Sequence, residues 1–181
     1  MVPCRHQVLH IGHASAALSK PLKKGQGMTE LALAKHCAEA MRNDDNASRA
    51  LGITSDVTSV GEACSRMTIR EDMVNGLDVC HGGLVFALAD TAFAFACNAY
   101  NVQSFAASCQ IEFLRPAKLG DELVANASED YRGRRSGYYT VKIYNQRDEL
   151  VALFRGRSGS NGEPVLSTKS DTENIDIIEK E

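Results

Sequence analysis

One carboxylate stands alone in a long apolar segment of this chain. Residues 84–97 read LVFALADTAFAFAC, and no Lys, Arg or second acid lies between Gly82 and Tyr100. Burying an unpaired carboxylate is costly unless its pKa shifts or another group binds it. A carboxylate held in this way can act as a general base or as a nucleophile, so Asp90 is the first candidate for chemistry.

The residues His81, Gly82 and Gly83 directly precede this apolar segment. The first N–H groups of a helix have no acceptor within the helix, and the positive end of the helix dipole lies beside them. Glycine lets a substrate carbonyl approach such donors closely. We therefore predict that Gly82 and Gly83 polarise a carbonyl oxygen that becomes negative in the transition state.

The spacing of these groups predicts an oligomer. Gly82 and Asp90 are eight residues apart, which is about 12 Å along a helix at about 1.5 Å per residue. One reacting carbon cannot lie within about 3 Å of both groups in a single chain. We therefore expect Gly82 of one subunit to face Asp90 of another.

Several side chains near the two groups have alternative interpretations. His81 can be a general base, but we favour a role in which it holds the loop by bonding to backbone. A dyad of Cys80 and His81 is disfavoured, because neighbouring side chains on an extended segment point to opposite faces. Thr91 can bond Asp90 or the substrate, or only pack, and Asn75 can fix a turn or line an acyl pocket. Asp90 itself can be a structural acid bonded to backbone across an interface.

The surrounding pattern predicts the elements that position these residues. An amphipathic helix from residue 29 ends at the polar run 43–46, a half-buried strand follows at 64–70, and the apolar helix ends near residues 98–101. Alternating segments after residue 107 indicate four strands in antiparallel meander order. Because the apolar helix is hydrophobic all round, something must wrap it on most sides. A curled antiparallel sheet around one long central helix, an α+β fold, satisfies this requirement.

Composition divides the chain and excludes several classes of function. We expect a flexible basic extension at 1–28, one domain at 29–158 and a disordered acidic tail at 159–181. Met28 is a plausible alternative start, and a transit peptide is the less favoured interpretation of the extension. A net charge of −3 favours neither nucleic acid nor an anionic membrane as partner, and the apolar segment is too short to span a bilayer.

The cysteines suggest neither a metal centre nor a redox motif. No C-x-x-C spacing occurs among Cys4, Cys37, Cys64, Cys80, Cys97 and Cys109. We expect most of them to be buried thiols in the reducing cytoplasm.

The motifs also resemble a known family. The segments Cys80-His81-Gly82-Gly83, Leu88-Ala89-Asp90-Thr91 and Phe113-Leu114-Arg115-Pro116 occur in the same order in the hotdog acyl-CoA thioesterases of bacterial phenylacetate degradation. The resemblance covers residues 40–158. It implies a hotdog fold and hydrolysis of a phenylacetyl-CoA or hydroxyphenylacetyl-CoA thioester, with Asp90 as nucleophile or general base and the Gly82 N–H on the carbonyl. It also implies a tetramer built as a dimer of dimers, with no metal or redox cofactor.

The resemblance extends to the binding of the acyl group. The family often places an Asn near the end of its first helix to meet the acyl group, and this position falls on Asp44 here, with Asn43 beside it. For the coenzyme phosphates, Arg115 is a candidate at a strand end, although solvated charges are common there.

Two other functions remain open at this point. A hotdog hydratase or dehydratase pairs a His with an acid, and His81 and Asp90 are present, but the pattern Asp-x-Asn-x-x-His is absent. A subunit that binds acyl-CoA without turnover is the non-enzymatic alternative.

Overall fold

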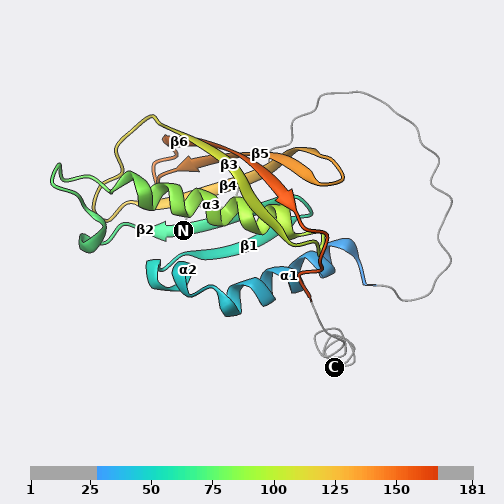
Figure 1. The fold of residues 1–181 in the computed structure, drawn as a ribbon. Helices are drawn as coiled ribbons and strands as arrows, with labels where there is room; N and C mark the ends of the chain where they lie inside the picture. The colour runs from blue at the N-terminus through green and yellow to red at the C-terminus, as the bar shows by residue number, and fades with distance from the viewer. Residues whose placement is uncertain (1–27, 167–181) are drawn as a thin grey trace.

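The computed structural model describes residues 28–166. The predicted extension at 1–27 and the part of the predicted tail beyond residue 166 lie outside the described residues. Six strands and three α-helices form the structure, with a 3-10 turn at Glu71–Met73 before the longest helix (Figure 1). The elements are α1 Glu30–Asp44, α2 Asn46–Leu51, β1 Thr54–Ser59, β2 Glu62–Thr68, α3 Gly82–Asn98, β3 Ser104–Phe113, β4 Glu122–Arg132, β5 Ser136–Tyr144 and β6 Leu150–Ser160.

The six strands form one antiparallel sheet in the order β1-β2-β4-β5-β6-β3. The prediction of four meander strands after the apolar helix is therefore wrong for β3, which pairs with β6 at an edge and not with β4. The connection between β3 and β4 spans residues 114–121, longer than the usual hairpin loop of about 2–5 residues, and it crosses the end of the sheet. The sequence analysis also missed β1, the second strand before α3.

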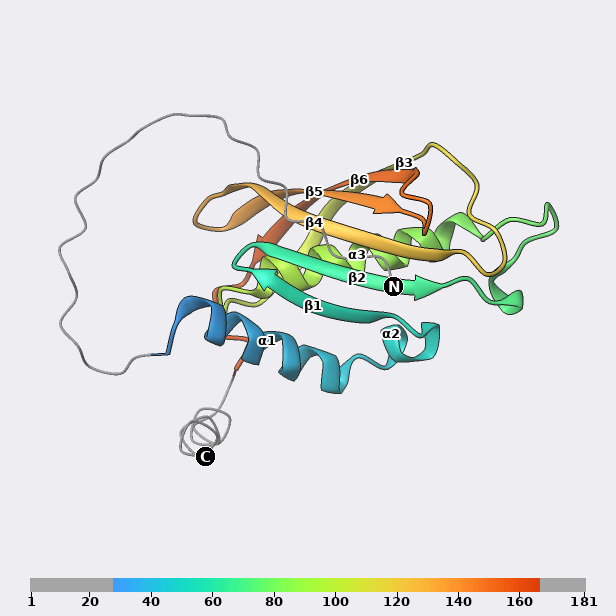
Figure 2. The same cartoon turned by 180° about the vertical axis from the view of Figure 1, so that it is seen from behind.

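The first helix begins and ends where its polar residues predict. Thr29 is the N-cap of α1, and its Oγ1 accepts a hydrogen bond from the Ala32 N–H at 3.1 Å. The polar run at 43–46 ends α1 and also begins a second, short helix, because the Asp45 side chain caps α2. Gly52 closes α2 in the left-handed region, at a φ of 69°. Together the two helices lie along β1 (Figure 2).

The core lies between α3 and the concave face of the sheet. Leu88, Ala92 and Phe93 of α3 are buried. The Phe93 ring packs edge-on against Tyr139 of β5, with 5.3 Å between ring centroids, and it fills the space beside Gly156 of β6. Burying a Phe side chain contributes about 2 kcal/mol, so these contacts fix how α3 lies across the sheet.

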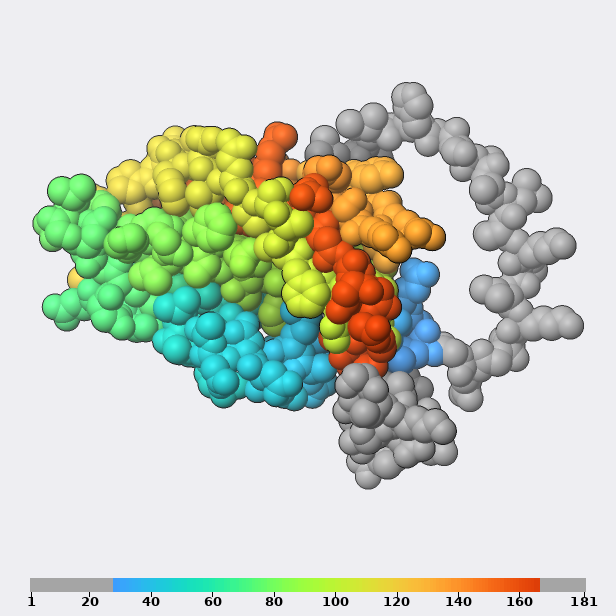
Figure 3. Space-filling model, viewed as in Figure 1, coloured from blue at the N-terminus to red at the C-terminus, as the bar shows by residue number. Residues whose placement is uncertain are grey.

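The fold wraps α3 on most sides, as predicted, and leaves one stripe of it uncovered. Ala87, Asp90, Thr91 and Ala94, spaced three or four residues apart, are only partly buried. Figure 3 shows α3 reaching the surface between α1–α2 and β3. Within a single chain, this stripe is therefore the least buried side of α3 between Leu84 and Asn98.

The C-terminal strand extends past the domain boundary predicted at residue 158, since β6 continues to Ser160. The following residues return to the loop after α3, where the Leu166 N–H donates to Asn101 Oδ1 at 2.9 Å. Among residues 28–166, no helix is both long and apolar enough to cross a bilayer.

Candidate active site

The start of α3 is fixed by His81. This residue is the N-cap, and its Nδ1 accepts a hydrogen bond from the Gly83 N–H at 3.2 Å. Its own N–H donates to the Met73 carbonyl oxygen at 2.9 Å, and its carbonyl accepts from the Leu84 N–H at 2.9 Å. His81 thus holds the loop through its backbone N–H and caps the first turn of the helix through its side chain, which is the loop role that the sequence favoured over that of general base.

The cap distinguishes the two glycines. The Gly83 N–H is already paired with His81, so it is not available to a substrate. Gly82 is the first residue of the helix, and its N–H has no acceptor among residues 28–166. A Cβ at Gly82 would lie 3.0 Å from Cζ of Phe113, so a larger residue here would require the exposed Phe113 ring to shift by a few tenths of an ångström. Of the two predicted donors, only Gly82 is free to bind a carbonyl oxygen.

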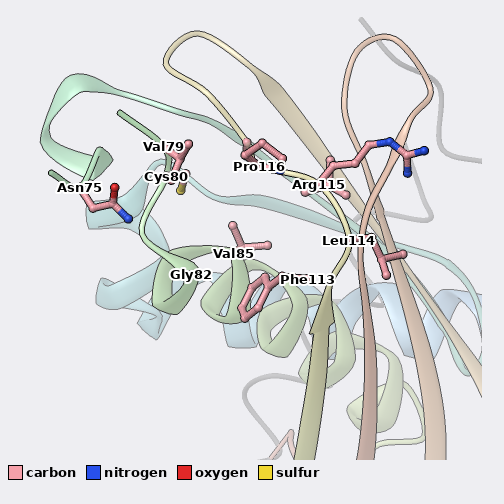
Figure 4. A pocket seen from close by; sticks show the side chains of 11 residues that line it. Asn75, Val79, Cys80, Gly82, Val85, Phe113, Leu114, Arg115 and Pro116 are labelled. Atoms are coloured by element: carbon pink, nitrogen blue, oxygen red, sulfur yellow. The ribbon is translucent and has the colours of Figure 1, made fainter. Parts of the chain in front are cut away.

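A cavity of about 320 Å³ opens beside Gly82. Its walls are the loop at 75–80, the first turn of α3 and the segment 113–117 (Figure 4). The walls are mostly apolar, with side chains such as Val79, Val85 and Phe113, and the Phe113 ring points toward the start of α3 (Figure 4). An apolar cavity with a free N–H in its wall can hold a carbonyl compound and polarise its oxygen.

Asn75 fixes a turn and also lines a cavity. Its side-chain Oδ1 accepts from the Leu77 N–H at 2.9 Å, and its backbone N–H donates to the Val79 carbonyl at 2.8 Å, so it fixes the tight turn before α3. Asn75 also lines the cavity beside Gly82. The turn holds Leu77 at its tip, where 82% of the side chain is exposed.

Arg115 borders the same cavity but points away from it (Figure 4). Its guanidinium donates to the Leu150 carbonyl oxygen at 2.8 Å. To bind a coenzyme phosphate as predicted, the Arg115 guanidinium would have to give up its hydrogen bond to the Leu150 carbonyl oxygen.

Asp90 lies in the middle of α3, on the uncovered stripe. Burial raises the pKa of the Asp90 carboxyl above its ordinary value of 3.8. Its nearest polar contact is the Cys109 thiol of β3, with 4.0 Å between Sγ and Oδ1. Among residues 28–166 no cation forms an ion pair with Asp90. A carboxylate of this kind is more basic than a surface Asp, as a general base or nucleophile requires.

Thr91 is not bonded to Asp90. Its hydroxyl donates to the Ala87 carbonyl oxygen at 2.8 Å and lies 3.3 Å from Oγ of Ser48. Ser48, which the sequence analysis did not single out, lines a second cavity of about 470 Å³ between α1–α2, β1 and α3. Asn43 lines this cavity too, whereas Asp44 is an exposed residue that is not part of its wall.

The structure brings most of the predicted residues together in two groups. His81, Gly82, Asn75 and Arg115 meet at the start of α3, while Asp90 lies two turns further along the same helix. Cys109 and Phe113 join these groups from β3 and were missed as site residues. In the sequence, Cys109 and Phe113 alternate with polar residues, which predicts that they share one face of a strand. Only the fold shows that this face of β3 packs against α3.

Comparison with known proteins agrees with this architecture. The sequence profile of the Thioesterase superfamily matches residues 77–152. The chain is 46% identical to the acyl-coenzyme A thioesterase PaaI of Escherichia coli (strain K12) over 121 residues, which is 67% of this chain and 86% of that protein.

Solved structures give the same result. The structure of the E. coli PaaI protein superposes with a TM-score of 0.74 at 42% identity, covering 75% of this chain and 99% of the other. A variant of the phenylacetic acid degradation protein PaaI from Thermus thermophilus has a TM-score of 0.61 at 35% identity, covering 64% and 98%. The expected α+β hotdog fold is confirmed, and the chain belongs to the thioesterase superfamily as a relative of the PaaI acyl-CoA thioesterases.

Proposed function

We propose that this protein is an acyl-CoA thioesterase that hydrolyses phenylacetyl-CoA or hydroxyphenylacetyl-CoA type thioesters. The observation that carries the proposal is the unpaired Gly82 N–H at the start of α3, on a residue that lines an apolar cavity. The kinship with PaaI, an acyl-coenzyme A thioesterase, supports the same reaction.

The chemistry follows from the Gly82 N–H and the Asp90 carboxylate. The Gly82 N–H stabilises the negative charge that develops on the thioester oxygen. As general base, Asp90 takes a proton from water while the water oxygen bonds to the acyl carbon; the carbon–sulfur bond then breaks, and the proton passes to the leaving thiolate. As nucleophile, an Asp90 oxygen bonds to the acyl carbon and the carbon–sulfur bond breaks, which releases the CoA thiolate; water then hydrolyses the acyl anhydride, which frees the acid and the Asp90 carboxylate, and the proton from water passes to the thiolate. Neither route requires an added metal or redox cofactor.

We infer that the complete site needs two subunits. Within one chain, Gly82 and Asp90 are eight helical residues apart, or about 12 Å. The uncovered stripe of α3 lies beside β3, whose outer edge has no partner strand among residues 28–166. A second copy that pairs through β3 by two-fold symmetry would cover both surfaces. It would supply its own start of α3 to Asp90.

The larger assembly and the location of the enzyme are part of the proposal. Two such dimers form the tetramer that the family resemblance implies. Cys37, Cys80, Cys97 and Cys109 are free thiols, which suits the reducing cytoplasm, whereas Cys64 is disulfide-bonded.

The second cavity offers a place for a substituted acyl ring. Phe95 and Ile53 supply apolar contacts there, and Ser48 and Asn43 supply polar groups that can bind a ring hydroxyl. The contact between Ser48 and Thr91 joins this cavity to the turn of α3 that carries Asp90.

The direct test measures thiol release from phenylacetyl-CoA, hydroxyphenylacetyl-CoA and short-chain acyl-CoAs by the wild type and Asp90→Asn. We expect the aryl substrates to be hydrolysed and the variant to lose about 10²-fold or more in kcat. Equal rates for the wild type and Asp90→Asn would show that Asp90 is neither general base nor nucleophile. Hydration of an enoyl-CoA would support a hydratase instead, and binding without turnover would support a non-catalytic subunit.

Mixed subunits test whether the site is shared. Asp90→Asn and Gly82→Pro are each expected to be inactive alone. In a mixed dimer, Asp90 of one chain can meet Gly82 of the other, so a random mixture should recover about a quarter of wild-type activity. No recovery in mixed dimers of confirmed composition would show that each chain holds its own site.

A further inference from the structure

We propose that Cys109 is a positioning residue for Asp90: its thiol donates a hydrogen bond to the carboxylate and holds it in one orientation on the open stripe of α3. This inference rests on the proposed role of Asp90 in thioester hydrolysis. It adds a group that touches neither the glycine donor nor the acyl cavity.

The geometry that carries the inference is the contact between β3 and α3. Cys109 lies opposite Gly156 of β6, on the same strand face as Ile111, which packs against the core. Its Sγ lies 4.0 Å from Oδ1 of Asp90, within the longer reach of sulfur, which is a weak donor. The thiol therefore meets the carboxylate from the strand that also forms the free edge of the sheet.

No other side chain of residues 28–166 is placed to hold Asp90. The Thr91 hydroxyl is bonded to the Ala87 carbonyl. Cys97, on α3, and Cys109, on β3, are the titratable groups that interact with Asp90 electrostatically within these residues. The Cys97 thiol donates to the Ala94 carbonyl at 3.4 Å, and burial raises its pKa to about 12, so it is neutral and bonded elsewhere.

The chemistry of the thiol suits this role. Burial and the nearby Asp90 charge both raise the pKa of Cys109, so the thiol keeps its proton and remains a donor. An Arg or Lys at this position would stabilise the carboxylate strongly and make it a poor base. A weak neutral donor orients the carboxylate while leaving it basic.

Two variants separate hydrogen bonding from packing. Cys109→Ala removes the thiol, whereas Cys109→Ser keeps a side chain of similar size whose hydroxyl, on a shorter bond to Cβ, lies beyond the reach of an O–H···O hydrogen bond to Oδ1. Cys97→Ala is the matched control, because it removes a buried thiol from the same region that is bonded to a backbone carbonyl. For each protein, the pH profile of kcat/KM is measured with phenylacetyl-CoA. The carboxyl carbon of Asp90 is also titrated by NMR in uniformly labelled protein, with Asp90→Asn identifying its signal.

We expect Cys109→Ala to move the acid limb of kcat/KM and the carbon titration to higher pH by about half a unit, because the ionised carboxylate loses a donor. Its kcat should fall several-fold with KM unchanged. Cys109→Ser should shift in the same direction, because its hydroxyl is too far from Oδ1 to donate, and Cys97→Ala should match the wild type.

Two results would overturn the inference: wild-type titration in Cys109→Ala, or an equal shift in the control Cys97→Ala. The NMR titration does not require turnover. If the wild type hydrolyses no thioester, the proposed function is wrong. The NMR titration of the Asp90 carboxyl carbon still tests the contact between Cys109 and Asp90. If hydrolysis depends on Asp90 but the titration does not respond to Cys109, only this inference fails.

Discussion

The two edges of the sheet differ in what covers them. β1 lies along α1, where Arg42 donates to the Ser55 carbonyl at 2.8 Å, and Ser55 and Val57 are buried (Figure 2). β3, at the other edge, has no helix beside its outer side among residues 28–166. Phe105 and Phe113, near its two ends, expose 59% and 53% of their side chains.

The difference shows where this chain is incomplete. Proteins normally protect an edge strand by covering it, shortening it or placing charges on it, since a bare edge pairs readily with another strand. β1 is protected by a helix, whereas β3 is a ten-residue strand whose ends carry exposed aromatic rings. β3 also contributes Cys109 to Asp90 and Phe113 to the wall beside Gly82. The bare edge and the candidate active site are therefore one surface, and assembly through it would complete both.

The largest expected effect comes from placing charge on the bare edge. In the double variant Ser108→Lys with Gln110→Lys, like charges meet across a two-fold axis through β3 and oppose pairing. We expect the mass measured by light scattering to fall to that of a smaller species and thioesterase activity to drop by about 10²-fold or more. Glu39→Lys, on the exposed face of α1, is the control and should change neither. An unaltered mass in the double variant would show that assembly uses another surface.

A second experiment removes the donor and keeps the fold. Gly82 is the first helical residue, where proline is well tolerated, and His81 has the extended ψ of 127° that a following proline requires. Gly82→Pro should lower kcat by about 10²–10³-fold, because it deletes the N–H that we assign to the oxyanion. In Gly82→Ala, the added Cβ also lies 3.0 Å from Cζ of Phe113, but the backbone N–H is retained. A smaller loss in the alanine variant, by steady-state kinetics, would separate the donor from the crowding.

A third prediction concerns stability and pH. Burial raises the pKa of Asp90 in the folded protein, so the charged form costs stability at neutral pH. This cost disappears as the pH falls through the folded-state pKa toward the unfolded value. Asp90→Asn should therefore raise Tm at pH 7, and the gain should shrink toward pH 4 in a series of thermal scans. A gain that does not depend on pH would contradict burial of the charge as its cause.

The smallest effect belongs to the covered edge. Asp56 and Arg42 form an ion pair at 3.4 Å in which both side chains are largely exposed. Asp56→Ala should change the free energy of unfolding in urea by less than about 1 kcal/mol, because solvent screens such pairs. It should leave the oligomeric mass unchanged. A large change in mass would mean that the β1 edge takes part in assembly.

Local patterns predicted the elements that their own residues specify. The glycines after His81 and the apolar run that follows placed α3 close to its observed bounds, Gly82–Asn98. The alternation around Met67 and Ile69 correctly predicted a buried strand face. In contrast, β1 was missed because its residues, TSDVTS, are mostly polar and small. The order of β3 could not be read from the chain, since Pro116 and Gly120 mark a break equally well in a hairpin or in a crossover.

The site divides in the same way. The sequence alone determined which groups can act: a lone carboxylate in an apolar helix, and N–H donors at the start of that helix. Only the tertiary structure decided that the His81 ring accepts a hydrogen bond from the Gly83 N–H, which leaves the Gly82 N–H as the free donor. The contact between the Cys109 thiol and the Asp90 carboxylate, and the uncovered stripe of α3, also depend on the tertiary structure. Side-chain chemistry and helical spacing are properties of neighbouring residues, whereas these contacts join segments that only the packing of α3 against the sheet brings together.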